Sequence, residues 1–440
     1  MVTSFQADRL LRTKQLTLTS NRQSVIRLNN LVNMLIDTFY NGVELHREEK
    51  IIYARFLKPH SVLSTCRVAG GLRTDLTWLY NHQSCEPAGH CHRLPSLAYR
   101  DPLAYRRAIC ERHNLEAENC ATLGTAANMH NAAIVQERFR NLEVVAVCTG
   151  GVEGNAGRAG DPASVVETAE GFERLPPANT IPGPGTINTL LFISKPLIPG
   201  ALTRCIMTAT EAKTAVLQEL VVNSRYSDGL ATGTGTDQIA VAAMEGDGPP
   251  LTSAGKHAKL GELIGRAVCE AIKGTLARQN NLTPAGQCSL KIHLERFGIK
   301  RAGLIDTICA FLDQNQAELL RANFLAFEHD PLTVAAVAAL VHLRDKITWG
   351  VLPRTCWSEI MANFAAQVVC AVSGDYCRLD HYRQTLAPTS RQSDNQAFLH
   401  LTCQALAMGF SEKWRSIETL TSLEAGSTCA MINQEVNFMK

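Results

Sequence analysis

Apolar residues in the first part of the chain follow two different spacings. Between residues 25 and 39, in VIRLNNLVNMLIDTF, they recur every three or four positions, which is the spacing of one face of a helix. We therefore expect residues 1–54 to form a partly exposed, helical N-terminal segment. From about residue 60 onward, the apolar residues instead come in short runs separated by glycine-rich turns.

These short runs predict strands. They read SVLSTCRVAGG, LTWLYNHQ, NLEVVAVCTGG, TINTLLFIS and QIAVAAM. Two stretches among them, 208–222 and 256–277, have helical spacing. Strands mixed with a few helices are typical of a sheet that is covered by helices. We expect an α+β (mixed α/β) domain over residues 55–278, with a β-sheet core covered by helices.

After residue 279 the strand signals fade. The stretches LIDTICAFLDQNQAELLRANFLAF, PLTVAAVAALVHLRDKITW and WSEIMANFAAQVVCAV all predict helices. We place a domain boundary near RQNNLTPAGQC (278–288). Residues 279–440 are expected to form a mainly helical C-terminal domain, to which the sequence assigns no role.

The composition excludes several classes of protein. The chain is 45% hydrophobic and 19% charged, and its formal net charge of +2 comes without a Lys/Arg-rich run, so we expect no nucleic-acid partner. No apolar stretch approaches the ~18 residues that a membrane span needs. The N-terminus is too polar for a signal peptide. We expect a cytoplasmic protein whose 15 cysteines are reduced.

One cluster carries metal-ligand residue types. The stretch CEPAGHCH holds Cys85, His90, Cys91 and His92, but its spacing matches no familiar zinc pattern. We favour a structural or incidental role for the cluster. The alternative is a metal that activates water.

A glycine-rich stretch, GGVEGNAGRAGDP (150–162), follows the apolar run VVAVC. Glycines let the backbone approach a ligand closely. In one interpretation, Asn155, Arg158 and Asp161 project into a pocket. In the other, Asp161 caps a following helix and pairs with Arg158. The sequence alone does not separate the two.

A second stretch, ATGTGTDQIAVA (231–242), alternates threonine with glycine before an apolar run. If it is extended, Thr232, Thr234 and Thr236 share one face, and their hydroxyls could bind an oxyanion or an amide. Asp237 could then accept a proton. The alternative is a tight bend in which Asp237 caps a turn. We favour the functional interpretation.

Two predicted helices add further candidates. In TATEAKTAVLQEL, Thr208 and Glu211 form a capping-box pattern, whereas Lys213 shares a face with core residues and is expected to be paired in a pocket. In GKHAKLGELIG, His257 begins a helix beside its apolar stripe. It is either a base or ligand, or a histidine satisfied at the edge of the core.

Taken together, several stretches are similar to the adenosylcobinamide amidohydrolase family, over roughly residues 55–277. The matching stretches, in order, are VLST…GG, NHQ, GTAANMHNAAIV, GNAGRAGDP, PGTINTLLFI, TATEAKTAVLQEL, ATGTGTDQIAVA and HAKLGELIG. Their order and spacing make the resemblance specific. The N-terminal segment and the helical tail fall outside it.

The resemblance implies hydrolysis of adenosylcobinamide to adenosylcobyric acid and aminopropanol, in corrinoid salvage. The partner is then a corrinoid small molecule, the cobalt belongs to that substrate, and we expect no further cofactor. A glycine-rich wall suits a large flat ligand edged with amides. We expect the substrate to be bound by Asn155, Arg158, Asp161, Glu211 and Asn188. A homo-oligomer is left open.

Catalytic roles are our own assignments. We expect Asp237 to act as the base, the hydroxyls of Thr234 and Thr236 to stabilise the oxyanion, and Lys213 or His257 to supply a proton. A rival scheme makes Thr234 or Thr236 a covalent nucleophile. The alternative function is a non-catalytic corrinoid-binding or carrier protein.

Overall fold

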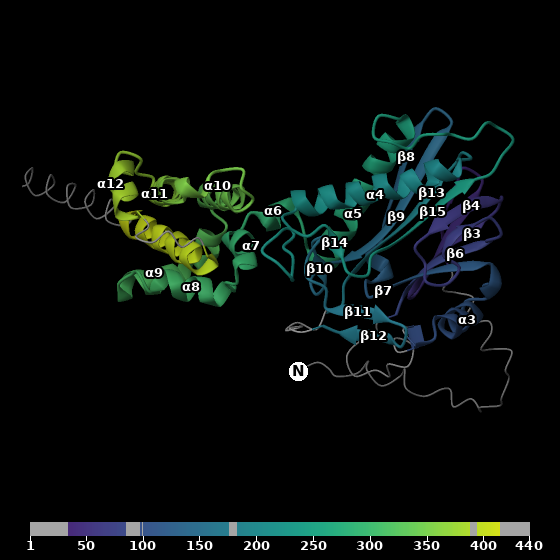
Figure 1. Cartoon of the computed structure of the whole chain (residues 1–440), viewed down its shortest axis with the longest axis horizontal. Coiled ribbons are helices and arrows are strands. Elements are labelled where there is room, and N and C mark those ends of the chain that lie inside the picture. Colours follow the sequence, from purple (N-terminus) through teal and green to yellow (C-terminus); the bar gives the residue numbers. More distant parts are fainter. Residues whose placement is uncertain (1–33, 85–96, 99, 176–182, 388–393, 414–440) are drawn as a thin grey trace, which may run out of the picture.

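Figure 1 shows the computed structural model of the chain, which describes residues 34–84, 97–98, 100–175, 183–387 and 394–413. The α+β part, residues 34–280, contains two large sheets and two small two-stranded ones. The helical region follows from residue 284. This arrangement confirms the predicted α+β fold followed by a mainly helical C-terminal region.

The first sheet has five strands in the order β1-β2-β3-β6-β7. Neighbouring strands are antiparallel except β6 and β7, which are parallel. The strands are β1 (Met34–Phe39), β2 (Val43–Glu48), β3 (Ile51–Phe56), β6 (Trp78–Gln83) and β7 (Cys120–Thr125).

Strands β1 to β3 show that the predicted helical segment is wrong over residues 34–54. Tyr40 and Asn41 have positive φ angles and turn the chain between β1 and β2. The dipeptide Asn41–Gly42 is a typical hairpin signal, and it outweighs a short run of helical spacing. Pairing in the sheet also buries the apolar residues of β3. Residues 1–33 lie outside the described part of the chain.

The second sheet has six strands in the order β5-β4-β15-β13-β9-β8, in which only β13 and β15 are parallel. Its strands are β4 (His60–Ser64), β5 (Gly71–Arg73), β8 (Ala133–Phe139), β9 (Leu142–Gly151), β13 (Thr186–Ile193) and β15 (Gln238–Met244). The smaller pairs are β10 (Ala156–Gly157) with β14 (Gly233–Thr234), and β11 (Val165–Thr168) with β12 (Gly171–Arg174).

The α+β part is built in four layers. Apolar residues of both sheets, among them Leu79, Val145 and Phe192, pack together in one core. Helices α4 (Pro199–Glu219) and α5 (Lys259–Asn280) cover the outer face of the second sheet. Helix α3 (Pro102–Arg112) covers the outer face of the first. Short 3-10 turns lie at Ala117–Asn119 and Met129–Asn131.

The helical region has its own core, which includes Phe297, Met361 and Phe398. Residues 395–413 are also helical. The other elements are α6 (Pro284–Gln287), α7 (Leu290–Leu294), α8 (Arg301–Cys309), α9 (Gln314–Glu328), α10 (Pro331–Thr348), α11 (Trp357–Ser373), α12 (Leu379–Thr385) and 3-10 turns at Glu295–Phe297 and Arg354–Cys356.

Among the residues that the structure describes, no individual helix combines the length and apolarity of a membrane span, although α9 and α10 meet both criteria when they are joined across their 79° bend.

Candidate active site

The motif residues gather at one edge of the two sheets. β9 ends at this edge, whereas β13 and β15 begin there, because Thr186 pairs with Gly151 and Asn188 pairs with Gln238. β6 and β7 also end at this edge, where Asn188 of β13 donates to the carbonyl of Gly124. Glycine-rich and threonine-rich loops therefore lie beside strand ends from both sheets.

Asp237 lies directly before β15 and is the centre of the site. Its Oδ1 accepts hydrogen bonds from the Ile187 N–H at 2.8 Å and the Thr234 hydroxyl at 2.6 Å. Its Oδ2 accepts from the Thr234 N–H at 2.9 Å and from the Lys213 ammonium. These four donors match the roughly four lone-pair sites of a carboxylate. Only 14% of the Asp237 side chain is exposed.

Lys213 reaches Asp237 because α4 connects the parallel strands β13 and β15 and packs against the chain before β15. The Thr214 hydroxyl donates to the Thr232 carbonyl at 3.1 Å, and the Gln218 amide donates to the Ala231 carbonyl at 2.9 Å. These bonds fix one face of α4 against the loop. The prediction that Lys213 is paired rather than reaching to solvent is confirmed by its ion pair with Asp237.

The three threonines do not form a row on one extended face, which corrects that expectation. The chain turns at residues 235–236. The Thr232 hydroxyl accepts from the Ala159 N–H at 2.9 Å, and the Thr236 hydroxyl donates to the Gly185 carbonyl at 2.9 Å. Only the Thr234 hydroxyl is directed to the Asp237 carboxylate.

Asn155 and Asn188 are buried, and both amides are engaged within the protein. The Asn155 Oδ1 accepts from the Tyr226 hydroxyl at 2.7 Å, and its Nδ2 donates to the Gly185 carbonyl at 3.2 Å. Asn188 is fully buried and donates to the Asn81 Oδ1 at 2.9 Å. Both side chains therefore hold the loops and sheets in place.

Arg158 and Asp161 lie nearer the surface, on the glycine-rich loop. The Asp161 Oδ2 accepts from the Arg158 N–H at 2.7 Å and the Ser224 hydroxyl at 2.6 Å. Burial raises the pKa of the Asp161 carboxyl, but hydrogen bonds from Ser224 and Ser227 outweigh burial, so its pKa lies below the ordinary value. The alternative in which Asp161 caps a helix is wrong, because strand β11 follows.

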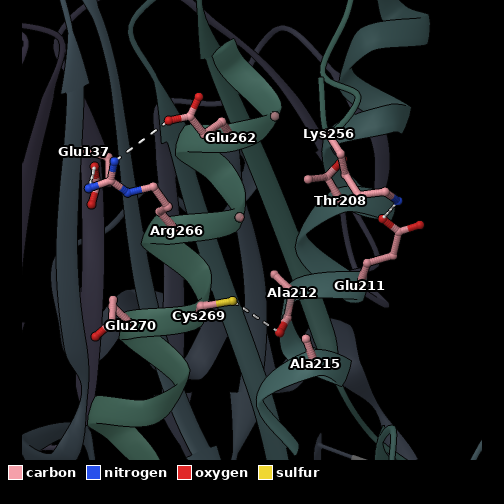
Figure 2. Close-up of a pocket in the computed structure, with 12 residues that line it drawn as sticks. Glu137, Thr208, Glu211, Ala212, Ala215, Lys256, Glu262, Arg266, Cys269 and Glu270 are labelled. Carbon is pink, nitrogen blue, oxygen red and sulfur yellow. Dashed lines mark hydrogen bonds and ion pairs between the residues drawn. The ribbon is translucent and has the colours of Figure 1, made fainter. Parts of the chain in front are cut away.

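Glu211 and His257 lie away from Asp237. β15 leads away from Asp237, and His257 follows its far end, exposed in the turn before α5. The neighbouring Lys256 pairs with Glu211 at 2.5 Å. This pair borders a groove of about 850 Å³ between α4 and α5, shown in Figure 2. The structure therefore does not bring His257 together with Lys213.

The capping-box interpretation of Thr208 and Glu211 is also wrong. α4 begins at Pro199, so Thr208 lies within the helix and not at its start. Its hydroxyl donates to the Ala254 carbonyl at 2.8 Å, which ties α4 to the chain before α5. Glu211 is left on the face of α4 that borders the groove (Figure 2).

Sequence reasoning missed a buried hydrogen-bond network that joins the two sheets beside Asp237. Asn81 donates to the Thr149 hydroxyl at 2.8 Å, and the Gly124 N–H donates to the Gln238 Oε1 at 2.9 Å. The stretch NHQ was the available signal for Asn81, because an amide inside an apolar strand is costly unless it is hydrogen-bonded.

Among the residues that the structure describes, no group of three His, Cys, Asp or Glu side chains could hold a metal ion. The cluster Cys85, His90, Cys91 and His92 lies outside those residues, so its role stays a prediction.

Three comparisons place the chain among known proteins. The sequence profile of the adenosylcobinamide amidohydrolase family matches residues 36–284. The uncharacterized protein MJ1613 of Methanocaldococcus jannaschii is 36% identical over 188 residues, which cover 42% of this chain and 72% of that protein. The crystal structure of the PH0078 protein from Pyrococcus horikoshii OT3 has a TM-score of 0.26 and 12% identity, covering 56% of this chain and 83% of that one.

Proposed function

The chain belongs to the adenosylcobinamide amidohydrolase family, and we propose that it hydrolyses the amide that links aminopropanol to the corrin ring of adenosylcobinamide. The products are adenosylcobyric acid and aminopropanol. The corrinoid, with its cobalt, is the substrate.

One observation carries the proposal. A threonine hydroxyl, a carboxylate and an ammonium group lie in direct succession at the edge of the sheets: Thr234 donates to Asp237 at 2.6 Å, and Lys213 pairs with the same carboxylate. A nucleophile within hydrogen-bond reach of a base, which is oriented by a third group, is the arrangement that covalent catalysis requires. The arrangement favours Thr234 over Thr236 as the nucleophile.

The proposed reaction has two halves. First, the Thr234 Oγ1 attacks the amide carbonyl while its proton moves to Asp237. That proton then reaches the leaving amine through the Asp237–Lys213 pair, aminopropanol departs, and an ester to Thr234 remains. In the second half, water attacks the ester and gives a proton to the same pair. The acid leaves, and Thr234 regains its proton.

The reaction is tested by mass spectrometry of adenosylcobinamide incubated with the purified chain. We expect adenosylcobyric acid and free aminopropanol. Substrate that stays bound but unchanged would instead support the carrier alternative. If the purified chain neither hydrolyses nor binds adenosylcobinamide, the proposed function is overturned.

The nucleophile is tested by a matched pair of variants. Thr234→Ser keeps a hydroxyl, and we expect it to retain turnover within about tenfold, whereas Thr234→Val should lose at least about 100-fold. Acid quenching during turnover should trap a corrinoid ester on the peptide that contains residue 234. Full activity of Thr234→Val would contradict the covalent scheme and leave Asp237 to activate water directly.

A further inference from the structure

The helical region and the glycine-rich loop together line a cavity of about 320 Å³. One wall comes from the α+β part and includes Arg158, Asp161 and Asp228. The other wall comes from the helical region and includes Arg344 and Trp349. The matching family profile ends at residue 284, so the second wall lies outside it.

Buried polar contacts fix this second wall in place. The Asp228 Oδ2 accepts from Arg344 at 3.3 Å and from Asn395 at 2.8 Å, and Arg296 donates to the Asp228 carbonyl. The side chains of Arg296 and Arg344 are only 4% and 6% exposed. Arg296 also pairs with Asp345 inside the helical region, so both guanidinium groups are held in place where they meet Asp228. The helical region is therefore held firmly against the 224–230 segment.

Thr234 does not itself line this cavity, but a short strand ladder connects it to Arg158, which does. Gly157 pairs with Gly233 and Ala156 pairs with Thr234 in the short β10–β14 ladder. Arg158 therefore directly follows Gly157, whose partner Gly233 is the residue before Thr234. A substrate that is much larger than the amide being cleaved would extend from Thr234 toward this cavity.

Most polar groups of the cavity already have partners, whereas the Arg158 guanidinium makes one long hydrogen bond. Asp345 pairs with Arg296 at 2.5 Å, and Asp161 accepts from Ser224. The Arg158 guanidinium reaches only the Leu230 carbonyl, at 3.5 Å, and is exposed. The Trp349 side chain is 56% exposed, and its ring has one cation–π contact, with the Lys346 ammonium 5.1 Å from the ring centroid. A donor for carbonyl oxygens and a flat apolar ring therefore face the same space.

We propose that the helical region supplies part of the substrate site, with Trp349 as a specificity-determining residue. Its ring packs against the apolar part of a flat macrocycle, while Arg158 donates to an amide oxygen at the edge of that macrocycle. This inference rests on the proposed function, because it takes the corrinoid as the ligand. It also gives a role to the helical region, which lies outside the part of the chain that matches the family profile.

The experiment compares three variants of the full chain: Trp349→Ala, Trp349→Phe and Tyr376→Ala. Tyr376 is a matched control, since it is an aromatic residue of the helical region that is 61% exposed and does not line the cavity. For each variant, KM and kcat are measured for adenosylcobinamide, and Kd is measured by equilibrium dialysis with Thr234→Val added so that the ligand is not consumed. Because Trp349 is exposed, its replacement should leave the fold intact, and circular dichroism checks this.

We expect Trp349→Ala to raise KM and Kd about tenfold, with kcat within about twofold, because a stacked ring is worth roughly 1–1.5 kcal/mol. Trp349→Phe should recover most of the affinity, and Tyr376→Ala should match the wild type. Unchanged KM and Kd in Trp349→Ala would overturn the inference, as would an equal loss in Tyr376→Ala.

The two proposals can fail separately. If the wild type binds adenosylcobinamide without hydrolysing it, the proposed reaction fails, but Kd still reports on Trp349. If hydrolysis is normal and Trp349→Ala is silent, only the inference fails. If the wild type does not bind adenosylcobinamide, both are overturned.

Discussion

The α+β part and the helical region use buried polar side chains differently. In the α+β part, Asn81, Thr149 and Asn188 form a connected network between the two sheets, beside Asp237. In the helical region, Arg296 and Arg344 are buried at the junction with the α+β part, where both donate to Asp228. One set surrounds a candidate reaction centre, whereas the other fastens two parts of the chain.

This difference bears on where chemistry can occur. A buried polar group costs free energy unless it is hydrogen-bonded, and a fully satisfied network holds each of its members in a fixed position. The sheet edge carries such a network, and the proposed reaction lies there. The helical region contributes one wall of the neighbouring cavity and the arginine side chains that attach this wall to Asp228. Substitutions in the two regions should therefore differ in kind as well as in size.

The largest expected effect is at the centre of the network. Asp237→Asn keeps the shape of the side chain but removes the charge that pairs with Lys213 and the base for Thr234, so we expect kcat to fall by at least about 100-fold. The control is Asp306→Asn in the helical region, which breaks an exposed pair with Arg321. That variant should keep wild-type kcat. Near-normal turnover of Asp237→Asn would remove Asp237 from the mechanism.

The second effect concerns acid sensitivity, which we expect to be strong in the α+β part. Burial lowers the pKa of His82 to about 3 and that of His60 to about 4. Below about pH 6.5 the unfolded chain binds protons at these positions while the folded chain does not, so the free energy of unfolding falls as the pH drops from there toward 4.

His82→Gln tests this linkage. Each histidine contributes at most about 1.4 kcal/mol per pH unit in that window, and we expect the variant to lose about that much of the slope. Urea unfolding at several pH values measures it. His257→Gln is the control, since that side chain is exposed. An unchanged slope in His82→Gln would show that His82 is not the source.

The sequence predicted the strands and helices better than the contacts of individual side chains. The runs around β4, β6, β9, β13 and β15 are short and bounded by turn residues, and the structure confirms each as a strand. The segment before residue 55 was wrong because a short helical spacing competed with the turn at Asn41, and pairing in the sheet prevailed. The spacing of apolar residues within one segment does not show which other strands that segment will pair with.

The same limit applies to the site. Lys213 was predicted to be paired because it lies on a core-facing stripe, and its ion pair confirms this. Thr208 was misassigned because the capping pattern is local, whereas α4 starts nine residues earlier, at Pro199. His257 was predicted to act beside Asp237, but β15 separates the two residues along the chain and runs away from Asp237. The direction in which a strand runs depends on how the whole sheet is assembled, so a local sequence pattern does not predict it.

A smaller effect should follow from adding one methyl group at the ion pair. A Cβ on Gly233 would lie 2.5 Å from the Asp237 Oδ2 and 2.8 Å from the Lys213 Nζ, so Gly233→Ala must push the pair apart. We expect kcat to fall about tenfold without unfolding, because steric displacement weakens the pair and does not remove it.

The matched change in the helical region is Gly303→Ala in α8. The added Cβ would meet its nearest atom at 3.7 Å, an ordinary contact, and alanine is favoured over glycine in a helix by up to ~1 kcal/mol. We expect unchanged kcat and a slightly higher melting temperature. If Gly233→Ala behaved like Gly303→Ala, the Lys213–Asp237 pair would not be needed in its present geometry.

The smallest expected effect is at His257. Its side chain is exposed beyond the far end of β15, and its neighbour Lys256 is engaged with Glu211 beside the groove between α4 and α5, which Thr234 and Asp237 do not line. His257→Ala should therefore change kcat and KM by less than about twofold. A loss of tenfold or more in kcat would require the segment before α5 to reach Asp237 during turnover. The catalytic centre would then extend beyond the sheet edge, and a proton donor would arrive from the groove between α4 and α5. A silent variant would leave the Asp237–Lys213 pair to return the proton to the leaving amine, as the arrangement of Thr234 and its two partners already suggests.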